Sequence, residues 1–191
     1  MRLFSPLYAR VMRWSRHPKA PWYLGILSFA ESSFFPIPPD VMLAPMSLAR
    51  PDRAWWYATL TTITSVAGGL FGYLIGALFF EAIRPWLETS SLWEPFQTAQ
   101  VWFMEWGFWA VFVAGFSPIP YKAFTIAAGM LGMPLLPFAL ASFVGRGGRF
   151  YIVAGLMKWG GARMETLLER YVDRLGWATV LVIVIGVLLW R

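Results

Sequence analysis

The chain has 191 residues, of which 58% are hydrophobic and only 14% charged, and its mean hydropathy is +0.56. Typical soluble domains are about 45–50% apolar and about 25% charged, so this composition excludes a soluble globular protein and a disordered chain. The sequence contains no cysteine and one histidine, His17, which excludes disulfides, thiolate catalysis and metal sites built from cysteines or several histidines. We therefore expect an integral membrane protein with no metal and no cofactor.

The net charge of +6 is best explained by membrane topology and contact with anionic lipid, not by binding to nucleic acid. Residues 1–21 carry five basic side chains and no acid, whereas residues 81–105 carry four acids and one arginine. By the positive-inside rule, the N-terminus and the turn at 50–53 are expected in the cytoplasm, residues 81–105 outside, and residues 158–174 in the cytoplasm again.

The first half of the chain predicts a surface helix, a broken apolar segment and a spanning helix. Residues 1–21 alternate apolar and basic side chains at helical spacing, which is typical of an amphipathic helix on a membrane surface. Residues 22–50 are apolar, but three prolines interrupt them: Pro36, Pro38 and Pro39. Because both ends of this segment are expected in the cytoplasm, we predict a re-entrant hairpin. Residues 54–83 are long enough to span and carry a helix-packing pattern of Gly68, Gly72 and Gly76.

The second half repeats this plan. Residues 85–106 mix tryptophans with glutamates and predict an interfacial segment on the outer face. Residues 107–137 predict a second broken hairpin around Pro118 and Pro120, and residues 138–160 predict another spanning helix. Residues 162–191 predict C-terminal helices, of which the last is a short transmembrane helix. Residues 22–191 are thus expected to form a single membrane domain.

An internal repeat supports this reading. Phe35-Pro-Ile-Pro-Pro-Asp40 resembles Ser117-Pro-Ile-Pro-Tyr-Lys122 at an offset of 82 residues. Because the two hairpins are expected on opposite sides of the membrane, the fold class predicted is an all-α membrane protein with an inverted repeat, a plan found in many secondary transporters. The repeat aligns Asp40 with Lys122, and the two could face each other if the breaks meet.

The segment from Glu31 to Asp40, E-S-S-F-F-P-I-P-P-D, resembles the E-x(4)-P-x-P-x-[DE] motif of the DedA family, also called the SNARE-associated or VTT domain family. Together with F-S-P-I-P-Y-K-A-F-T-I-A-A-G over 116–129, it is most similar to the short YqaA-like branch. The resemblance implies a multi-pass protein of the bacterial inner membrane with paired re-entrant hairpins. Members of the family are linked to moving lipids, and bacterial ones are proposed to return polyprenyl phosphate carriers to the cytoplasmic leaflet.

The resemblance also implies site residues. By motif position, Glu31 and Asp40 form the acidic pair, for which proton coupling is suspected in the family. The larger branch carries two arginines in its second motif, whereas this chain has Phe116 and Lys122 at those positions. The resemblance therefore does not extend to the paired arginines of the second motif.

Five charges lie in or beside apolar segments, where each costs at least about 2.5–3.5 kcal/mol at the bilayer centre: Glu31, Asp40, Lys122, Arg146 and Arg149. The two acids are candidates for accepting protons. The three basic residues are candidates for binding an anionic head group, since arginine grips phosphate with two parallel hydrogen bonds. In the alternative interpretation, these charges cap broken helices, pair for stability or reach out to lipid phosphates.

The function that these features favour is a membrane lipid transporter, either a proton-coupled flippase or a passive scramblase. Its expected partner is an anionic lipid phosphate, such as undecaprenyl phosphate or a phospholipid. A factor in membrane homeostasis or assembly and a small-ion transporter remain alternatives, and a homo-oligomer is possible. A lipid phosphatase is disfavoured, because one histidine and no cysteine leave little for a nucleophile with its base.

Overall fold

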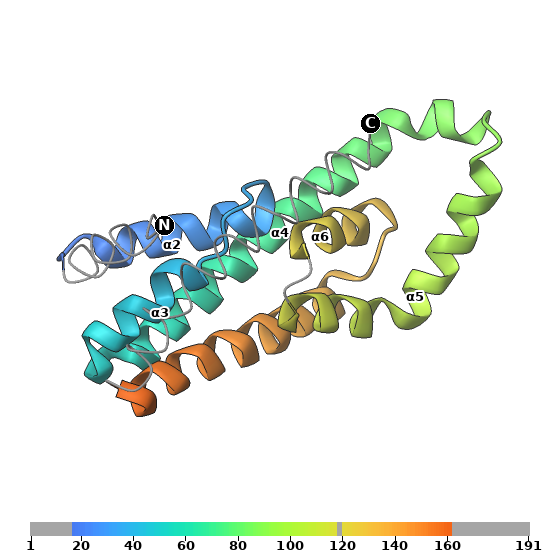
Figure 1. Ribbon diagram of the computed structural model, residues 1–191. Helices are drawn as coiled ribbons and strands as arrows, with labels where there is room; N and C mark the ends of the chain where they lie inside the picture. Colours follow the sequence, from blue (N-terminus) through green and yellow to red (C-terminus); the bar gives the residue numbers. More distant parts are fainter. Residues whose placement is uncertain (1–16, 118–119, 162–191) are drawn as a thin grey trace, which may run out of the picture.

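The computed structural model describes residues 17–117 and 120–161, which fold into helices joined by short turns (Figure 1). These residues contain no strand, in agreement with the predicted all-α class. The elements are α2 (Ala20–Ser33), α3 (Asp40–Ala49), the 3-10 turn η1 (Pro51–Arg53), α4 (Ala54–Glu88), α5 (Trp93–Phe116), α6 (Tyr121–Met130) and a helix over residues 135–161. Pro118, most of the predicted surface helix and the predicted C-terminal helices lie outside the described residues.

The long helix α4 is the centre of the fold, and α2, α3 and α6 all pack against it. Its three spaced glycines are buried because a neighbouring helix comes too close for a side chain at each of them. A Cβ atom on Gly68 would collide with the carbonyl of Phe29 in α2, and one on Gly76 would collide with the carbonyl of Ile126 in α6. The predicted packing role of the glycine pattern is therefore confirmed.

Within the described part of the chain, the segment Pro51–Glu88 is the single helix long and apolar enough to cross a membrane by length and composition. It contains the predicted span 54–83 and continues through Pro85, which lies inside α4. The chain then turns, and α5 runs without interruption from Trp93 to Phe116. The structure thus places no helix break at the predicted boundary near residue 107. Pro95 does not end α5, because it lies in the first helical turn, where a backbone N–H has no partner to lose.

Both proline segments interrupt the helices. α2 ends at Ser33, and α3 starts at Asp40 and runs back toward the end of the molecule where α2 begins (Figure 1). Likewise α5 ends at Phe116, and α6 starts at Tyr121. α3 and α6 have ten residues each, about 15 Å of helix, which is half of the roughly 30 Å that a bilayer core requires.

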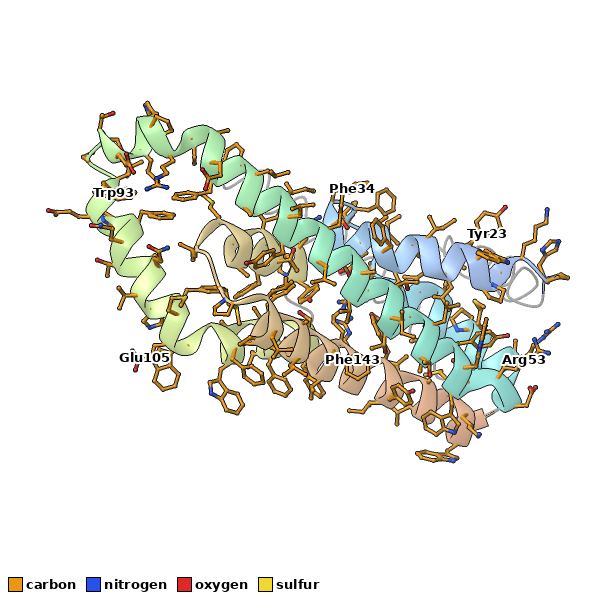
Figure 2. All side chains as sticks on the ribbon, turned by 180° about the vertical axis from the view of Figure 1, so that it is seen from behind. Tyr23, Phe34, Arg53, Trp93, Glu105 and Phe143 are labelled. Atoms are coloured by element: carbon orange, nitrogen blue, oxygen red, sulfur yellow. The ribbon has the colours of Figure 1, made fainter. Side chains whose placement is uncertain are left out.

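Apolar side chains cover much of the outer surface (Figure 2). Trp22 and Trp159 are each 77% exposed, and Leu136 and Val101 are 70% and 69% exposed. Isolated exposed apolar residues are normal in soluble proteins, but contiguous apolar surfaces mark contact with membranes or partners. The buried core is mainly apolar, but serines and threonines of α2 and α4 also lie in it beside an arginine.

Candidate functional site

A buried arginine joins the end of α2 to the middle of α4. Arg146, on the 135–161 helix, is 1% exposed. Its Nη2 donates to the Glu31 carboxylate and, at 3.3 Å, to Ser32 Oγ, while its Nε donates to Ser65 Oγ at 2.6 Å. The two serine hydroxyls are themselves hydrogen bonded, with their oxygens 2.7 Å apart. The buried cation thus has its counter-ion and a network of hydrogen bonds, which burial of a charge requires.

Two aromatic rings complete the surroundings of this guanidinium. The Cζ atom of Arg146 lies 4.9 Å from the ring centre of Tyr121 and 4.7 Å from that of Phe150. Both rings belong to fully buried residues, and at these distances each attracts the cation. Arg146 is therefore enclosed, so a ligand could reach it only after these contacts separate.

A second, more accessible ion pair connects the two helix breaks. Arg149 donates from Nη2 to Asp40 Oδ2 at 2.5 Å and from Nη1 to the Ser117 carbonyl at 2.8 Å. Asp40 is the first residue of α3, and Ser117 directly follows α5. The side chains of Arg149 and Asp40 are 20% and 22% exposed. Asp40 Oδ1 is buried and accepts no hydrogen bond from any described residue, so this carboxylate is only partly satisfied.

One helix face supplies both cations. Arg146 and Arg149 are three residues apart on the 135–161 helix, so their side chains lie on the same face. Their carboxylate partners stand on either side of the first break, Glu31 in the last turn of α2 and Asp40 in the first turn of α3. The structure therefore gathers four of the five predicted charged residues at the place where the two breaks meet.

The fifth residue, Lys122, which the repeat aligns with Asp40, forms no ion pair with it. It is half-buried near the start of α6 and forms no ion pair with any residue that the structure describes. Neighbouring residues on a helix point in different directions, and Tyr121 is the residue of that turn whose side chain contacts the Arg146 guanidinium. Arg149 takes the place beside Asp40 instead.

The glycines around the two arginines serve packing in this structure. A Cβ atom on Gly145 would lie 2.6 Å from the Phe112 carbonyl oxygen, and one on Gly147 would lie 3.4 Å from Thr62 Cγ2. These glycines let the 135–161 helix approach α5 and α4 closely. They account for how the arginines reach the centre of the bundle.

Reasoning from the sequence missed three members of the site, Ser65, Tyr121 and Phe150. A signal for Ser65 exists, because it lies one turn before Gly68 on the small-residue face of α4. Tyr121 stands inside the second motif, at the position of Pro39 in the first. Within 17–117 and 120–161, no three histidine, aspartate or glutamate side chains lie close enough to share a metal ion.

The match to a protein family covers most of the region that contains these residues. The family model of the VTT domain matches residues 37–159, more than half of the chain. The protein therefore belongs to the VTT domain family, also known as the DedA family, a family of membrane proteins. Both arginines and Asp40 lie inside the matched region, whereas Glu31 precedes it.

Particular relatives extend the comparison. Uncharacterised proteins of Haemophilus influenzae and Histophilus somni are each 42% identical to the chain, over 97% of both lengths. The undecaprenyl phosphate transporter A of Staphylococcus aureus is 31% identical over 131 residues, which cover 63% of this chain and 64% of the transporter. No solved structure matches the chain.

Proposed function

We propose that the protein moves an anionic lipid phosphate, of the undecaprenyl phosphate class, from one leaflet of a bacterial inner membrane to the other. The observation that carries this proposal is the partly exposed Arg149–Asp40 pair at the meeting point of the two helix breaks. Membership of the VTT domain family and similarity to a protein named as an undecaprenyl phosphate transporter support it. Transport, and not catalysis, is the role that we assign to the site.

The proposed mechanism is an exchange of anions on Arg149. A phosphate offers the same bidentate acceptor geometry as a carboxylate, so an incoming head group competes with Asp40 for this guanidinium. Protonation of Asp40 removes its charge and weakens its hold on Arg149, which favours the phosphate. Release of the proton restores the pair and expels the phosphate. In this way the occupancy of one site is coupled to one proton.

The other charged residues have separate parts in this proposal. Lys122, half-buried and without an ion-pair partner among the described residues, adds attraction for the head group. Glu31 and Arg146 form a second acid–base pair that exchanges only when Tyr121 and Phe150 move away. We assign Glu31 a proton-coupling role and Arg146 a head-group role in that opened state.

We further propose that the two broken helix pairs are re-entrant hairpins of an inverted repeat. The segment α2–break–α3 precedes the long helix α4, and the segment α5–break–α6 precedes the helix over 135–161. The ten-residue lengths of α3 and α6 favour hairpins that enter the membrane without crossing it. The N-terminus would lie in the cytoplasm, as the basic residues before α2 indicate.

The test is transport by the purified full chain in liposomes, with fluorescent polyprenyl phosphate and fluorescent phospholipid compared with and without a pH gradient. We expect movement of the polyprenyl phosphate that responds to the gradient in the wild-type protein and is lost in Asp40→Asn. The matched control is Glu81→Gln, because the side chain of Glu81 is exposed on α4 outside the site. Arg149→Gln should abolish transport, whereas Arg84→Gln, at an exposed pair, should not.

Each result of this experiment decides a different part of the proposal. If Asp40→Asn transports normally, the proton-coupling role of Asp40 is wrong. If both lipids move equally without a gradient, the protein is a passive scramblase. If neither lipid moves while the protein inserts and folds, lipid transport is wrong, and an ion path or an assembly role must explain the charges.

A further inference from the structure

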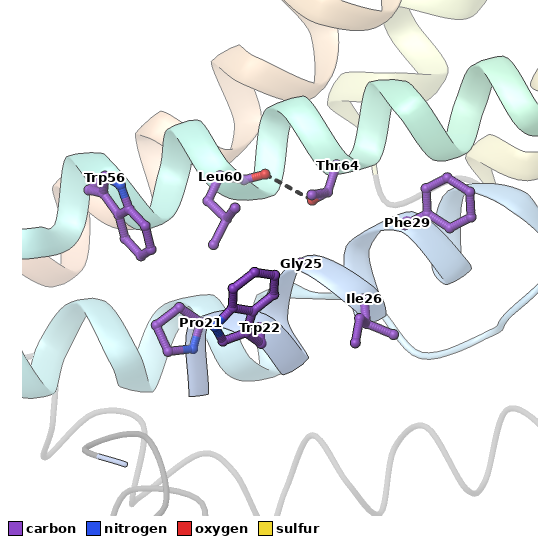
Figure 3. Close-up of a pocket in the computed structure, with 8 residues that line it drawn as sticks. All are labelled: Pro21, Trp22, Gly25, Ile26, Phe29, Trp56, Leu60 and Thr64. Atoms are coloured by element: carbon purple, nitrogen blue, oxygen red, sulfur yellow. Dashed lines mark hydrogen bonds between the residues drawn. The ribbon is translucent and has the colours of Figure 1, made fainter. Parts of the chain in front are cut away.

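A groove between α2 and α4 has none of the charged site residues in its lining and has no role in the mechanism above. It encloses about 470 Å³, within the range of about 300–1,000 Å³ that is usual for small-molecule sites. Figure 3 shows its lining, which comes from α2 on one side and α4 on the other: Pro21, Trp22, Gly25, Ile26, Phe29, Trp56, Leu60 and Thr64. The groove follows nine residues of each helix, about 12 Å in length.

The chemistry of this lining is apolar throughout. The one polar residue, Thr64, uses its hydroxyl to donate to the carbonyls of Leu60 and Thr61, at 2.8 and 3.2 Å. Its methyl carbon is then the atom nearest to a Cβ built on Gly25, at 3.4 Å. The missing side chain at Gly25 therefore leaves space between the helices that only an apolar group would fill favourably.

The rim of the groove adds positive charge at one end. Trp22 and Trp56, 77% and 51% exposed, belong to this end. Lys19 directly precedes α2, and Arg53 directly precedes α4, and both are exposed. The Arg53 guanidinium lies 3.9 Å from the carboxylate of Asp52, an exposed pair that an incoming phosphate would replace. An apolar groove with tryptophans and cations at its mouth is complementary to a lipid with an anionic phosphate and a long apolar chain.

We propose that this groove binds the hydrocarbon chain of a polyprenyl phosphate, with the phosphate at Lys19 and Arg53. The groove is a docking site at the membrane surface, from which the lipid passes to Arg149. This inference rests on the proposed function for the identity of the head group. The binding itself is a separate property of α2 and α4, and it is measured without transport.

The absence of cysteine from the chain permits a site-specific test. Ile26→Cys places a thiol in the groove at a position that is 64% exposed, and Leu78→Cys provides a matched control on α4 at 63%. The control position is 18 residues from Leu60, about 27 Å along the helix. Each purified full-length variant is labelled with benzophenone maleimide and reconstituted into phosphatidylcholine vesicles that contain undecaprenyl phosphate. After illumination, the mass of the cross-linked protein is measured by intact-mass spectrometry.

We expect the label at position 26 to give an adduct with the mass of undecaprenyl phosphate that saturates as this lipid is added. The label at position 78 should give adducts in proportion to the bulk lipid composition. Undecaprenol, which lacks the phosphate, should compete poorly. The double substitution Lys19→Gln/Arg53→Gln should raise the half-saturating lipid concentration at least about tenfold, equivalent to 1.4 kcal/mol.

Three outcomes would overturn the groove assignment. The first is labelling at position 26 in proportion to the bulk lipid composition. The second is an internal cross-link without added mass, and the third is a product of twice the protein mass. The last two would mean that another segment of the chain or a second copy fills the groove. Saturable labelling without transport would refute the proposed transport function and support lipid binding in the groove. Transport with unsaturable labelling would support the transport function and refute binding in the groove.

Filling the groove from within gives an independent measurement. Gly25→Leu should lower saturable labelling at position 26 by about tenfold, because its side chain would occupy the space between Leu60 and Thr64. Gly25→Ala is the control for folding, since its methyl group would meet those residues at 3.4 Å or more. Equal labelling of a folded Gly25→Leu protein and the wild type would contradict the proposal.

Discussion

Replacing Arg146 with glutamine is expected to destabilise the protein far more than the same change at Arg149. In Arg146→Gln, the Glu31 carboxylate loses its counter-ion, while its side chain is only 15% exposed. Removing one partner of a buried ion pair costs about 3–5 kcal/mol. At about 2–4 °C per kcal/mol for a chain of this length, the melting temperature should fall by about 6–20 °C.

The loss at Arg149 should be smaller, because solvent reaches that pair. Both side chains of the Arg149–Asp40 pair are about one-fifth exposed, so Asp40 can be rehydrated when its partner is removed. We expect Arg149→Gln to cost about 1–2 kcal/mol. Arg84→Gln, which breaks an exposed pair with Glu88 at 2.8 Å, should leave the melting temperature unchanged.

The assay is thermal unfolding of the purified proteins in one detergent, followed by tryptophan fluorescence. A further variant, Glu31→Gln/Arg146→Met, distinguishes an uncompensated charge from lost packing. Because it leaves no unpaired charge, it should recover at least half of the loss seen in Arg146→Gln. If the double variant is no more stable than Arg146→Gln, or if Arg146→Gln melts like wild type, the assignment of Arg146 as an enclosed charge is refuted.

Three further predictions concern coupling and packing. Asp40→Asn should abolish the response of lipid transport to a pH gradient, and a response equal to wild type in liposomes would contradict the exchange on Arg149. Gly129→Ala should cost about 1–3 kcal/mol of stability, because its methyl group would collide with the Tyr73 carbonyl. Gly25→Ala should be nearly neutral, and equal melting temperatures of the two variants would disprove this prediction. Tyr73→Phe removes a 2.7 Å hydrogen bond to the Met133 carbonyl and should cost about 1 kcal/mol in the same assay, and no change would show that the bond does not contribute.

Particular residues show how far local sequence rules reach in this protein. Proline disrupts a helix by its covalent structure, so the interruptions between Ser33 and Asp40 and before Tyr121 were predictable. Glycines four residues apart on an apolar helix predict close packing, and Gly68 and Gly76 provide it. The boundary of α5 was less predictable, because tryptophans and glutamates indicate an interface without determining where a helix stops.

The sequence by itself determined that this is a helical membrane protein, where its helices break, and which five charges need an explanation. These properties follow from hydropathy, proline geometry and the cost of desolvating a charge, all of which act locally. The tertiary structure alone decided the partners. Arg146 meets a carboxylate 115 residues away and Arg149 meets one 109 residues away. Spacing places two side chains on one helix face, but only the packing of that helix against α2, α3 and α4 selects what the face touches.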